Sequence, residues 1–463
     1  MYWSLFILAS FYICQYFIVF KCCLIRFITS WKYFLNMVHL SLAAEKLNAV
    51  LEKQSPFICS LLSKAGQKAF FPKDGIPGQT ADAKGTKINA TIGQAFEDDG
   101  RIMFLNAFKK QSLLSPEETF MYSPNYGQPQ LRKLWKELIL EKNPDLGSEI
   151  SLPVVCSGLT HGLYIISRLF VDDNDTLVLP DLHWGNYKLI FEQADLDLYP
   201  LFDNDGFNIK SLEEKTSGNN QKKIVLLNFP NNPTGYSPTV SEAEAIIKVL
   251  KESAERGNRL LVICDDAYFG LNYEKNIYPS SLFDLLTDLH ENLLAVKIDG
   301  ISKEAYSWGL RVAFVTYGGK GLSPEVLEVL ENKTAGIIRG TVSNVCTHSQ
   351  NVVFKGLSDA SFTSQVEEKK KILQQRYEAV KDVLNKHPEY TRCFEPLPFN
   401  SGYFMCIELK KHDADMIRKR LISESGVGVI SSGKLLRIAY SSISKEKITL
   451  LFQKVYEVCT ETS

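Results

Sequence analysis

Two apolar runs of the chain, each ending in polar residues, read Ile224-Val-Leu-Leu-Asn-Phe-Pro-Asn-Asn-Pro-Thr-Gly235 and Leu260-Leu-Val-Ile-Cys-Asp-Asp-Ala-Tyr268. Between them lies a polar, helix-length segment, Ser241–Ala254. Short, uninterrupted apolar runs that alternate with helices are typical of parallel strands that are buried on both faces. This part of the sequence therefore predicts a strand–helix–strand unit of an α/β domain.

The same alternation extends to both sides of this unit. Further short apolar runs are Val154–Val155, Leu177–Leu179 and Leu294–Val296. A charged, helix-length stretch, Gln365–Lys386, then precedes a second group of expected strands, Gly402–Leu409, Gly428–Ile430 and Leu435–Ala439. We expect a large domain with a mostly parallel central sheet flanked by helices, followed by a smaller α+β domain. No Gly/Ser linker separates the two, so we expect them to pack tightly.

The composition is that of an ordinary globular protein. Hydrophobic residues make up 45% of the 463 residues, and 52 basic residues balance 53 acidic ones. A balanced charge argues against nucleic acid as a partner. The ten cysteines include no Cys-x-x-Cys pair, which favours reduced thiols in an intracellular setting. His348 and Cys346 lack further ligand residues at a useful spacing, so we predict no metal site.

Residues 1–36 differ from the rest of the chain. Tyr2–Phe20 carries no charge, and as a helix it would span roughly 28 Å, nearly a bilayer core. Basic residues follow it, which would place the main body in the cytoplasm. The alternatives are a start site assigned too far upstream, with Met37 as the first residue, and a targeting peptide. We expect a cytoplasmic protein, with contact to a membrane only if residues 2–20 form an anchor.

The functional groups follow the expected strands at their carboxyl ends, where ligands bind in α/β sheets. These groups are an anion-binding helix start with Thr160, an aromatic face, an amide, a carboxylate, a phenol, a lysine and an arginine. A lysine can form a Schiff base, a carboxylate can pair with a ring nitrogen, and a helix N-terminus can hold a phosphate. Pyridoxal phosphate requires all of these groups together.

Several motifs then resemble one family. Gly300-Ile-Ser-Lys-Glu-Ala-Tyr-Ser-Trp-Gly-Leu-Arg311 is similar to the lysine and arginine segment of the class I/II aminotransferases, which are fold-type I pyridoxal-phosphate enzymes. Asn231-Asn-Pro-Thr-Gly235 and Asp265-Asp-Ala-Tyr268 resemble two further motifs of that family, in the same order. The resemblance extends from about Ala44 to Val458. It implies four parts: the extension 1–36, an N-terminal arm with part of the small domain (37–98), a large cofactor domain (99–364) and a small C-terminal domain (365–463).

The resemblance also implies roles for individual residues. Lys303 would carry the cofactor as a Schiff base and move the proton, and Asp265 would keep the ring nitrogen protonated. Tyr268 and Asn232 would bind the phenolic oxygen of the ring, and Trp184 would stack on the ring. The phosphate contacts would come from Leu159, Thr160, Ser302 and Arg311, and from Tyr122 of a neighbouring subunit, which implies a homodimer. Asp266 is interpreted as a turn or helix acid.

Three positions concern the substrates, an amino acid and a 2-oxo acid. Arg437 would clamp the α-carboxylate, Gly93 lies in a loop that would close over the substrate, and Arg339 would hold a distal carboxylate. Two departures from the family pattern are visible: Gly300 replaces a phosphate-binding Ser, and the connection 430–434 is short.

The predicted activity is the transfer of an amino group from an L-amino acid to a 2-oxo acid. One alternative is a carbon–sulfur β-lyase of the same fold type, which would use the same residues. Another is a non-catalytic, membrane-tethered scaffold, against which the complete set of site residues argues. A DNA-binding regulator is disfavoured because residues 1–36 have the wrong composition for a winged helix.

Overall fold

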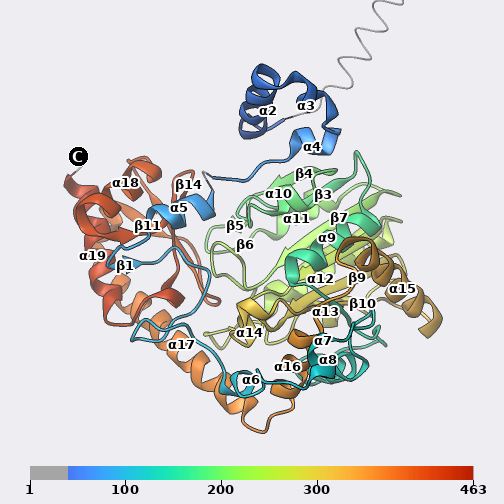
Figure 1. Ribbon diagram of the computed structural model, residues 1–463. Coiled ribbons are helices and arrows are strands. Elements are labelled where there is room, and N and C mark those ends of the chain that lie inside the picture. Colours follow the sequence, from blue (N-terminus) through green and yellow to red (C-terminus); the bar gives the residue numbers. More distant parts are fainter. Residues whose placement is uncertain (1–39, 74, 462–463) are drawn as a thin grey trace, which may run out of the picture. The chain divides into compact units, whose positions relative to one another are not determined.

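The computed structural model describes residues 40–73 and 75–461 (Figure 1). The chain divides into two compact units, residues 1–78 and 79–463. In the first unit, helices α2 (Leu42–Gln54), α3 (Pro56–Leu61) and α4 (Lys64–Lys68) follow one another. Ser41 and Ser63 cap α2 and α4 through their side-chain oxygens, at 3.2 and 3.0 Å from backbone amides. The predicted extension 1–36 lies outside the described residues.

The second unit contains a large, mostly parallel sheet. Its strands run in the order β2-β10-β9-β8-β7-β3-β4. The bounds are β2 Val154–Cys156, β3 Thr176–Pro180, β4 Asp195–Tyr199, β7 Lys222–Asn228, β8 Arg259–Asp265, β9 Leu293–Gly300 and β10 Ala313–Gly318. Within this sheet β10 is antiparallel to both of its neighbours. The five apolar runs of the sequence all form strands here, which confirms the predicted α/β fold.

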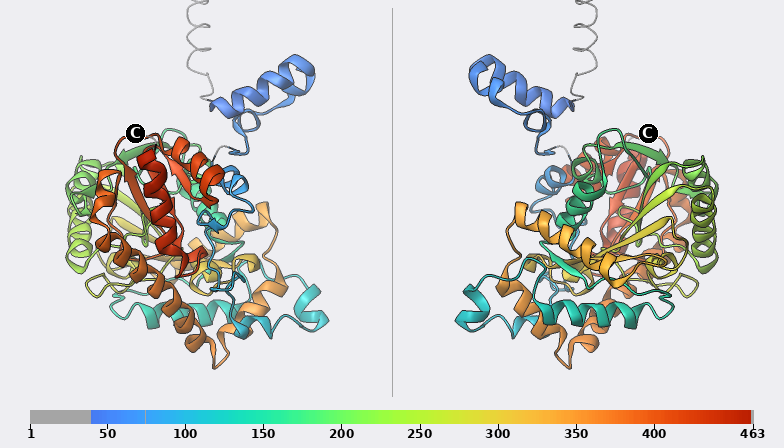
Figure 2. Two further views of the ribbon diagram at one scale, coloured as in Figure 1. Left: turned by 90° about the vertical axis from the view of Figure 1, so that its left-hand side faces the viewer. Right: turned by 90° about the vertical axis from the view of Figure 1, so that its right-hand side faces the viewer.

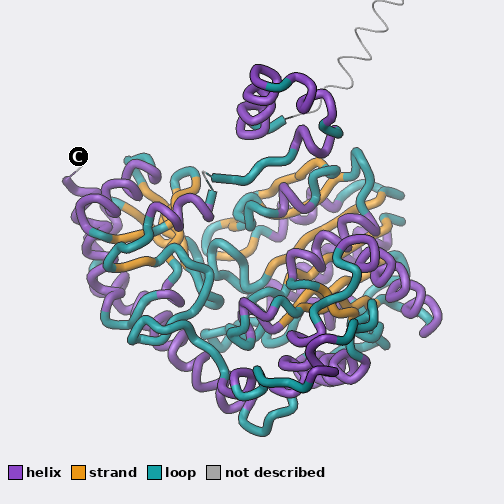
Figure 3. The backbone as a smooth tube through the Cα atoms, in the orientation of Figure 1, coloured by secondary structure: helices purple, strands orange, loops and turns teal. Residues whose placement is uncertain are grey.

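Helices pack against the sheet, and Figure 3 shows the strands in orange and the helices in purple. Helix α9 packs against β9 and β10, and α13 packs against β9. The large-domain helices are α6 Asn106–Lys109, α7 Pro116–Phe120, α8 Pro129–Lys142, α9 Leu159–Phe170, α10 Tyr187–Ile190, α11 Ile209–Thr216, α12 Val240–Glu255, α13 Leu282–Leu286, α14 Ile301–Glu304, α15 Pro324–Thr341 and α16 Thr347–Leu357. A short hairpin, β5 Phe202–Asp203 with β6 Gly206–Phe207, lies between β4 and α11.

A second, antiparallel sheet follows the long helix α17 (Phe362–Lys386). Its strand order is β11-β12-β15-β14, with bounds β11 Phe394–Pro396, β12 Met405–Leu409, β14 Ile430–Ser432 and β15 Leu435–Ile438. Helices α18 Ala414–Arg420 and α19 Lys447–Glu461 belong to the same region, which is orange to red in both views of Figure 2. The two-residue strand β1 (Ile88–Asn89) pairs with β13 (Val427–Gly428), and α5 (Ile76–Asp82) precedes it.

A second hydrophobic core, separate from the core around the large sheet, joins residues 88–90 with the region 377–459. The N-terminal strand β1 is therefore built into the C-terminal part of the molecule. The domain boundaries at residues 98 and 364 stay predictions.

The Asn231–Gly235 turn packs against the segment that precedes β12. Gly235 has a φ of +73°, and a Cβ at this position would lie 2.0 Å from the carbonyl oxygen of Phe404. Only glycine fits this close approach of backbone to backbone. Asn231 holds the turn because its side-chain oxygen accepts hydrogen bonds from the amide and the hydroxyl of Thr234, at 3.1 and 2.7 Å. The turn after β7 thereby packs directly against residues that lead into β12.

Within residues 40–73 and 75–461, no helix is both long and apolar enough to cross a bilayer. The same residues contain no group of His, Cys, Asp or Glu side chains arranged to hold a metal ion.

Candidate active site

Asp265, the last residue of β8, lies buried at the carboxyl end of the sheet. Its carboxylate accepts a hydrogen bond of 2.6 Å from the Tyr187 hydroxyl and one of 3.2 Å from the Ala267 amide. Burial raises the pKa of Asp265, while the Tyr187 hydrogen bond and the charge of Lys303 act to lower it. The side-chain amide of Asn228, at the end of β7, donates to the Asp265 carbonyl at 2.8 Å. The carboxylate is therefore held in a fixed orientation.

Lys303 lies on the adjacent strand end. Strand β9 stops at Gly300, and the short helix α14 carries Lys303 to a position where its Nζ lies 5.2 Å from the centre of the Tyr268 ring. The backbone carbonyl of Lys303 accepts a 3.0 Å hydrogen bond from the Tyr403 hydroxyl. Burial lowers the pKa of Lys303, Asp265 opposes this shift, and Arg311 adds to it. A carboxylate and a guanidinium thus act in opposite directions on the charge of the lysine, and burial disfavours its protonated form.

An anion-binding cradle lies next to this lysine. Helix α9 starts after Gly158, which has a φ of +82°. A Cβ on Gly158 would lie 2.2 Å from Nη2 of Arg311, so the guanidinium lies directly against the start of the helix. Thr160 in the first turn is exposed, and Leu159 precedes it. Free backbone amides and a guanidinium at a helix N-terminus favour a bound phosphate.

The serine that precedes Lys303 in the sequence has a side-chain oxygen without a hydrogen-bond partner in the described part of the chain. Ser302, which precedes Lys303, is 1% exposed, and its buried hydroxyl has no hydrogen-bond partner within the described residues. A buried hydroxyl without a partner is costly, so the Ser302 hydroxyl is available to a ligand.

Arg437, on β15, is a buried cation close to the same site. Its guanidinium donates to the carbonyl oxygen of Thr91 at 2.9 Å and to the side-chain oxygen of Asn232 at 3.3 Å. The guanidinium carbon of Arg437 lies 4.4 Å from the centre of the Phe404 ring, and its Nε has no hydrogen-bond partner among the described residues. Burial lowers the pKa of Arg437, because these neutral contacts replace water without supplying a carboxylate.

The aromatic residues of the site make edge-on contacts with one another. Trp184 is half-buried and makes an edge-on contact with Tyr187, with 5.6 Å between the ring centres. Tyr268 is buried and makes edge-on contacts with Tyr403 and Phe404, at 5.2 and 5.6 Å. Burial raises the pKa of Tyr268, while the nearby charge of Arg437 acts to lower it. A Cβ on Gly93 would lie 3.5 Å from the Phe404 ring, so the Gly93 loop borders the Arg437 side of the site.

Two of the predicted residues, Tyr122 and Arg339, are exposed. Tyr122 is 89% exposed and follows two exposed residues, Phe120 and Met121. Arg339 is also exposed, and its guanidinium donates to the hydroxyl of Ser343 at 2.8 Å, near the end of its own helix. Most of the other predicted residues follow the carboxyl ends of β2, β3, β7, β8 and β9, whereas Arg311 directly precedes β10, Arg437 lies on β15 and Gly93 lies in the loop after β1.

Three residues of this site were missing from the sequence interpretation. Tyr187 binds Asp265, Tyr403 binds the Lys303 backbone, and Phe404 covers Arg437. One weak signal pointed to Tyr187: it lies three residues after Trp184, one helical turn further on. The aromatic pair Tyr403–Phe404 follows Gly402 without any motif of its own.

Comparison with known proteins agrees with this geometry. Residues 86–455 match the family model for aminotransferase class I and II. The chain is 26% identical over 272 residues to a probable aspartate/prephenate aminotransferase of Aquifex aeolicus, an alignment covering 58% of this chain and 64% of that protein. It is 24% identical over 324 residues to an aspartate aminotransferase of Geobacillus stearothermophilus, covering 68% of this chain and 74% of that one.

The fold agrees with solved structures as well. A crystal structure of an aminotransferase from Anaerococcus prevotii superposes with a TM-score of 0.75 at 23% identity, covering 86% of this chain and 99% of that chain. The matching strands and helices define the fold of a transaminase. The chain belongs to the class I and II aminotransferase family. This confirms the resemblance inferred from its motifs and the prediction of an enzyme that transfers amino groups.

Proposed function

We propose that the protein is a pyridoxal-phosphate-dependent aminotransferase that moves an amino group between an L-amino acid and a 2-oxo acid. The observation that carries this proposal is Lys303, whose Nζ lies 5.2 Å from the centre of the Tyr268 ring and whose pKa is lowered by burial and by Arg311, with Asp265 opposing the shift. An amine whose charge is disfavoured, near an anion-binding group and a fixed carboxylate, is suited to hold a carbonyl compound that also carries a phosphate.

The residues present fit this cofactor, which the family implies. The Gly158–Arg311 contact and the start of α9 form a phosphate cradle, and the unpartnered Ser302 hydroxyl lies beside Lys303 in the sequence. Arg311, Ser302, Thr160 and the Leu159 amide would hold the phosphate. Trp184 would cover one face of the ring, and Tyr268 and Asn232 would bind its phenolic oxygen. When bound, the cofactor supplies a carbonyl that takes up the amino group and a ring that accepts electrons from Cα.

The chain's own groups perform the proton chemistry. Asp265, oriented by Tyr187, would keep a proton on the ring nitrogen, because a carboxylate favours the cationic form of a neighbouring base. The amine of Lys303, whose protonated form burial disfavours, would remove the proton from Cα of the amino acid and deliver it to the carbon of the cofactor that had carried the carbonyl oxygen. The Tyr403 hydrogen bond to the Lys303 carbonyl keeps the backbone of the lysine in place during this movement.

Arg437 is the proposed clamp for the substrate α-carboxylate. A buried guanidinium without an acidic partner favours an anion, and its planar fork matches a carboxylate. The Nε atom that lacks a partner in the described structure is one of the donors available for this contact. Gly93 borders the clamp through Phe404 and would close over the substrate.

We also propose a homodimer in which each subunit completes the site of the other. Support comes from the exposed apolar segment Phe120–Tyr122, whose side chains are 83%, 64% and 89% exposed. Such a run is unfavourable in water and is typical of a protein interface. In this dimer Tyr122 would reach the phosphate in the neighbouring site. Arg339 would face the distal carboxylate of a dicarboxylic substrate.

The test is a single half-reaction. The loaded enzyme, given an amino acid without a 2-oxo acid, is expected to release one 2-oxo acid per site and then stop. Continued release of ammonia together with pyruvate would instead identify a lyase and would contradict the proposal. The Lys303→Ala variant is expected to release no oxo acid and to lack the visible absorbance of the bound cofactor. Retention of both properties would show that Lys303 is misassigned.

A further inference from the structure

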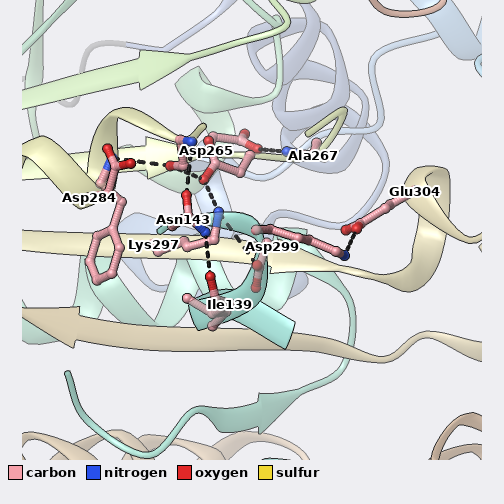
Figure 4. Close-up of polar contacts among 12 residues, drawn as sticks. Ile139, Asn143, Asp265, Ala267, Asp284, Lys297, Asp299 and Glu304 are labelled. Atoms are coloured by element: carbon pink, nitrogen blue, oxygen red, sulfur yellow. Dashed lines mark hydrogen bonds and ion pairs between the residues drawn. The ribbon is translucent and has the colours of Figure 1, made fainter. Parts of the chain in front are cut away.

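A second lysine, Lys297, lies buried beneath the proposed site. It occupies β9, six residues before Lys303, and its side chain is 0% exposed. Its Nζ forms an ion pair with Asp266, lies 3.5 Å from a carboxylate oxygen of Asp299, and lies 4.3 Å from the centre of the Phe269 ring. Figure 4 shows Lys297 and Asp299 within this polar network, close to Asp265. The proposed chemistry uses none of these three charged groups directly.

The two lysines are separated by the sheet geometry. Side chains alternate between the faces of a strand, so Lys297 and Asp299 share one face of β9 and Ile298 lies on the other. A Cβ on Gly162 of α9 would lie 2.9 Å from the Ile298 side chain, which places α9 on the opposite face. On the Lys297 face, the Trp135 indole of α8 donates to Asp299 at 2.9 Å. Lys297 is therefore a core residue on the face of the sheet that lies opposite to α9.

Asp266 connects this network to the site. It directly follows Asp265 at the end of β8, and its backbone amide donates to the Ile298 carbonyl of β9 at 2.9 Å. Its carboxylate accepts a 2.6 Å hydrogen bond from the Ser281 hydroxyl and the ion pair from Lys297. Asp266 is thus a buried partner of Lys297, where the sequence suggested only a turn or helix acid. The ion pair joins the end of β8 to the body of β9.

The buried ion pair of Lys297 and Asp266 is better explained by the orientation that it imposes than by a gain in stability. A buried ion pair is often no more stabilising than apolar residues of similar volume, because both charges lose their hydration. Burial raises the pKa of Asp299 to about 6, with Lys297 opposing the shift and Glu304 adding to it. Burial also works against the charge of Lys297, but Asp266 and Asp299 outweigh it and raise its pKa. The directional contacts of the network hold two strand ends in one defined register.

We propose that Lys297 is a positioning residue for Asp265: by pairing with Asp266 and Asp299, it fixes the end of β8 against the strand that leads to Lys303. The two groups that act on the cofactor are presented by these neighbouring strand ends. A loss of the ion pair leaves Asp266 free to shift, and the covalently linked Asp265 shifts with it. This inference rests on the proposed function, since it concerns the binding of pyridoxal phosphate.

The test measures cofactor binding by the full chain. The Lys297→Met variant is expected to raise the Kd for pyridoxal phosphate by about tenfold, an effect of the size seen when groups that orient binding residues are removed. Equilibrium dialysis gives the Kd, and visible circular dichroism reports how the bound cofactor is oriented. In an Asp265→Ala background, Lys297→Met is expected to change the Kd no further, because Lys297 acts through Asp265.

Control variants separate this role from plain stability. Arg132→Met removes another buried ion pair of the second unit, between Arg132 and Glu331 at 2.7 Å, and is expected to lower stability without changing the Kd. If Lys297→Met fails to fold, Asp266→Asn takes its place, since it removes the charge that holds Lys297 while keeping an acceptor for Ser281.

The outcomes are distinct. An unchanged Kd and dichroism in the folded Lys297 or Asp266 variant would overturn the inference, and so would an equal loss in the Asp265→Ala background. A wild-type chain that binds no pyridoxal phosphate would instead overturn the proposed function.

Discussion

The guanidinium of Arg311 occupies the space that any side chain on Gly158 would need. A Cβ on Gly158 would lie 2.2 Å from Nη2 and 2.7 Å from the guanidinium carbon. These residues are 153 positions apart in the sequence, since 311 − 158 = 153, yet they lie in contact at the proposed phosphate cradle. The position of Arg311 therefore requires glycine at residue 158, because any side chain there would occupy the space of the guanidinium.

A methyl group at Gly158 is expected to damage this cradle. Gly158→Ala forces a left-handed backbone at φ +82° on a residue with a side chain, which costs about 1–2 kcal/mol, and displaces Arg311. We expect the Kd for pyridoxal phosphate to rise by about tenfold or more, measured by equilibrium dialysis. Gly336→Ala is the matched control, because a Cβ there meets open space. Unchanged binding in Gly158→Ala would show that the phosphate lies elsewhere.

Substitution of Arg437 is expected to separate substrate binding from cofactor binding. Arg437→Ala removes the proposed carboxylate clamp, and charged hydrogen bonds contribute about 1.5–3 kcal/mol. The KM for the amino acid should therefore rise by about tenfold to a hundredfold, while the visible absorbance of the bound cofactor remains. Steady-state kinetics with the amino acid, and with an amine that lacks a carboxylate, provide the check. An equal loss for both substrates would argue against a carboxylate clamp.

Subunit mixing tests the shared site. Lys303→Ala and Tyr122→Ala chains are each expected to be impaired, because each lacks one component of the site. After the two chains are unfolded together and refolded, mixed dimers contain one intact site. If Tyr122 acts in trans, activity should return to about a quarter of the wild-type value, as random pairing predicts. No recovery in dimers shown by sedimentation to be mixed would contradict the proposed contribution of Tyr122.

Asp284 provides a prediction for pH. Burial raises its pKa to about 6, although hydrogen bonds from Tyr278 and from the Leu285 amide oppose the rise. The folded state therefore holds this proton more tightly than the unfolded state, so the stabilisation is present at low pH and is lost as pH rises through about 6. The Asp284→Asn variant does not lose this stabilisation as the pH rises, because asparagine does not titrate in this range.

We therefore expect the free energy of unfolding of Asp284→Asn, relative to wild type, to increase between pH 4 and about 6 and then to level off. Denaturant titrations at several pH values measure this difference. A constant difference across the range would show that the pKa of Asp284 is not raised.

Much of the large domain could be predicted from local pattern. The run Leu260–Ile263 lies inside β8, and Ser241–Ala254 forms nearly all of α12, because burial of consecutive residues is visible as apolar periodicity. The polar residues after each strand also mark the site, since parallel strands end at one edge of a sheet. Strand β4 had no such signal: Asp195–Tyr199 alternates charged and apolar residues and lies at the sheet edge. Strand β10 was missing from the sequence interpretation although it begins with the apolar residues Ala313–Val315.

The sequence by itself determined the fold class, the family and the residues with reactive groups, because these follow from local periodicity and from motifs read in order. Only the tertiary structure decided which groups touch. Tyr187 reaches Asp265 across 78 positions, Arg437 reaches Asn232 across 205, and Lys297 pairs with Asp266 across 31. Such contacts depend on the strand order and on which face of a strand each side chain occupies. Neither is encoded in any short stretch of the chain.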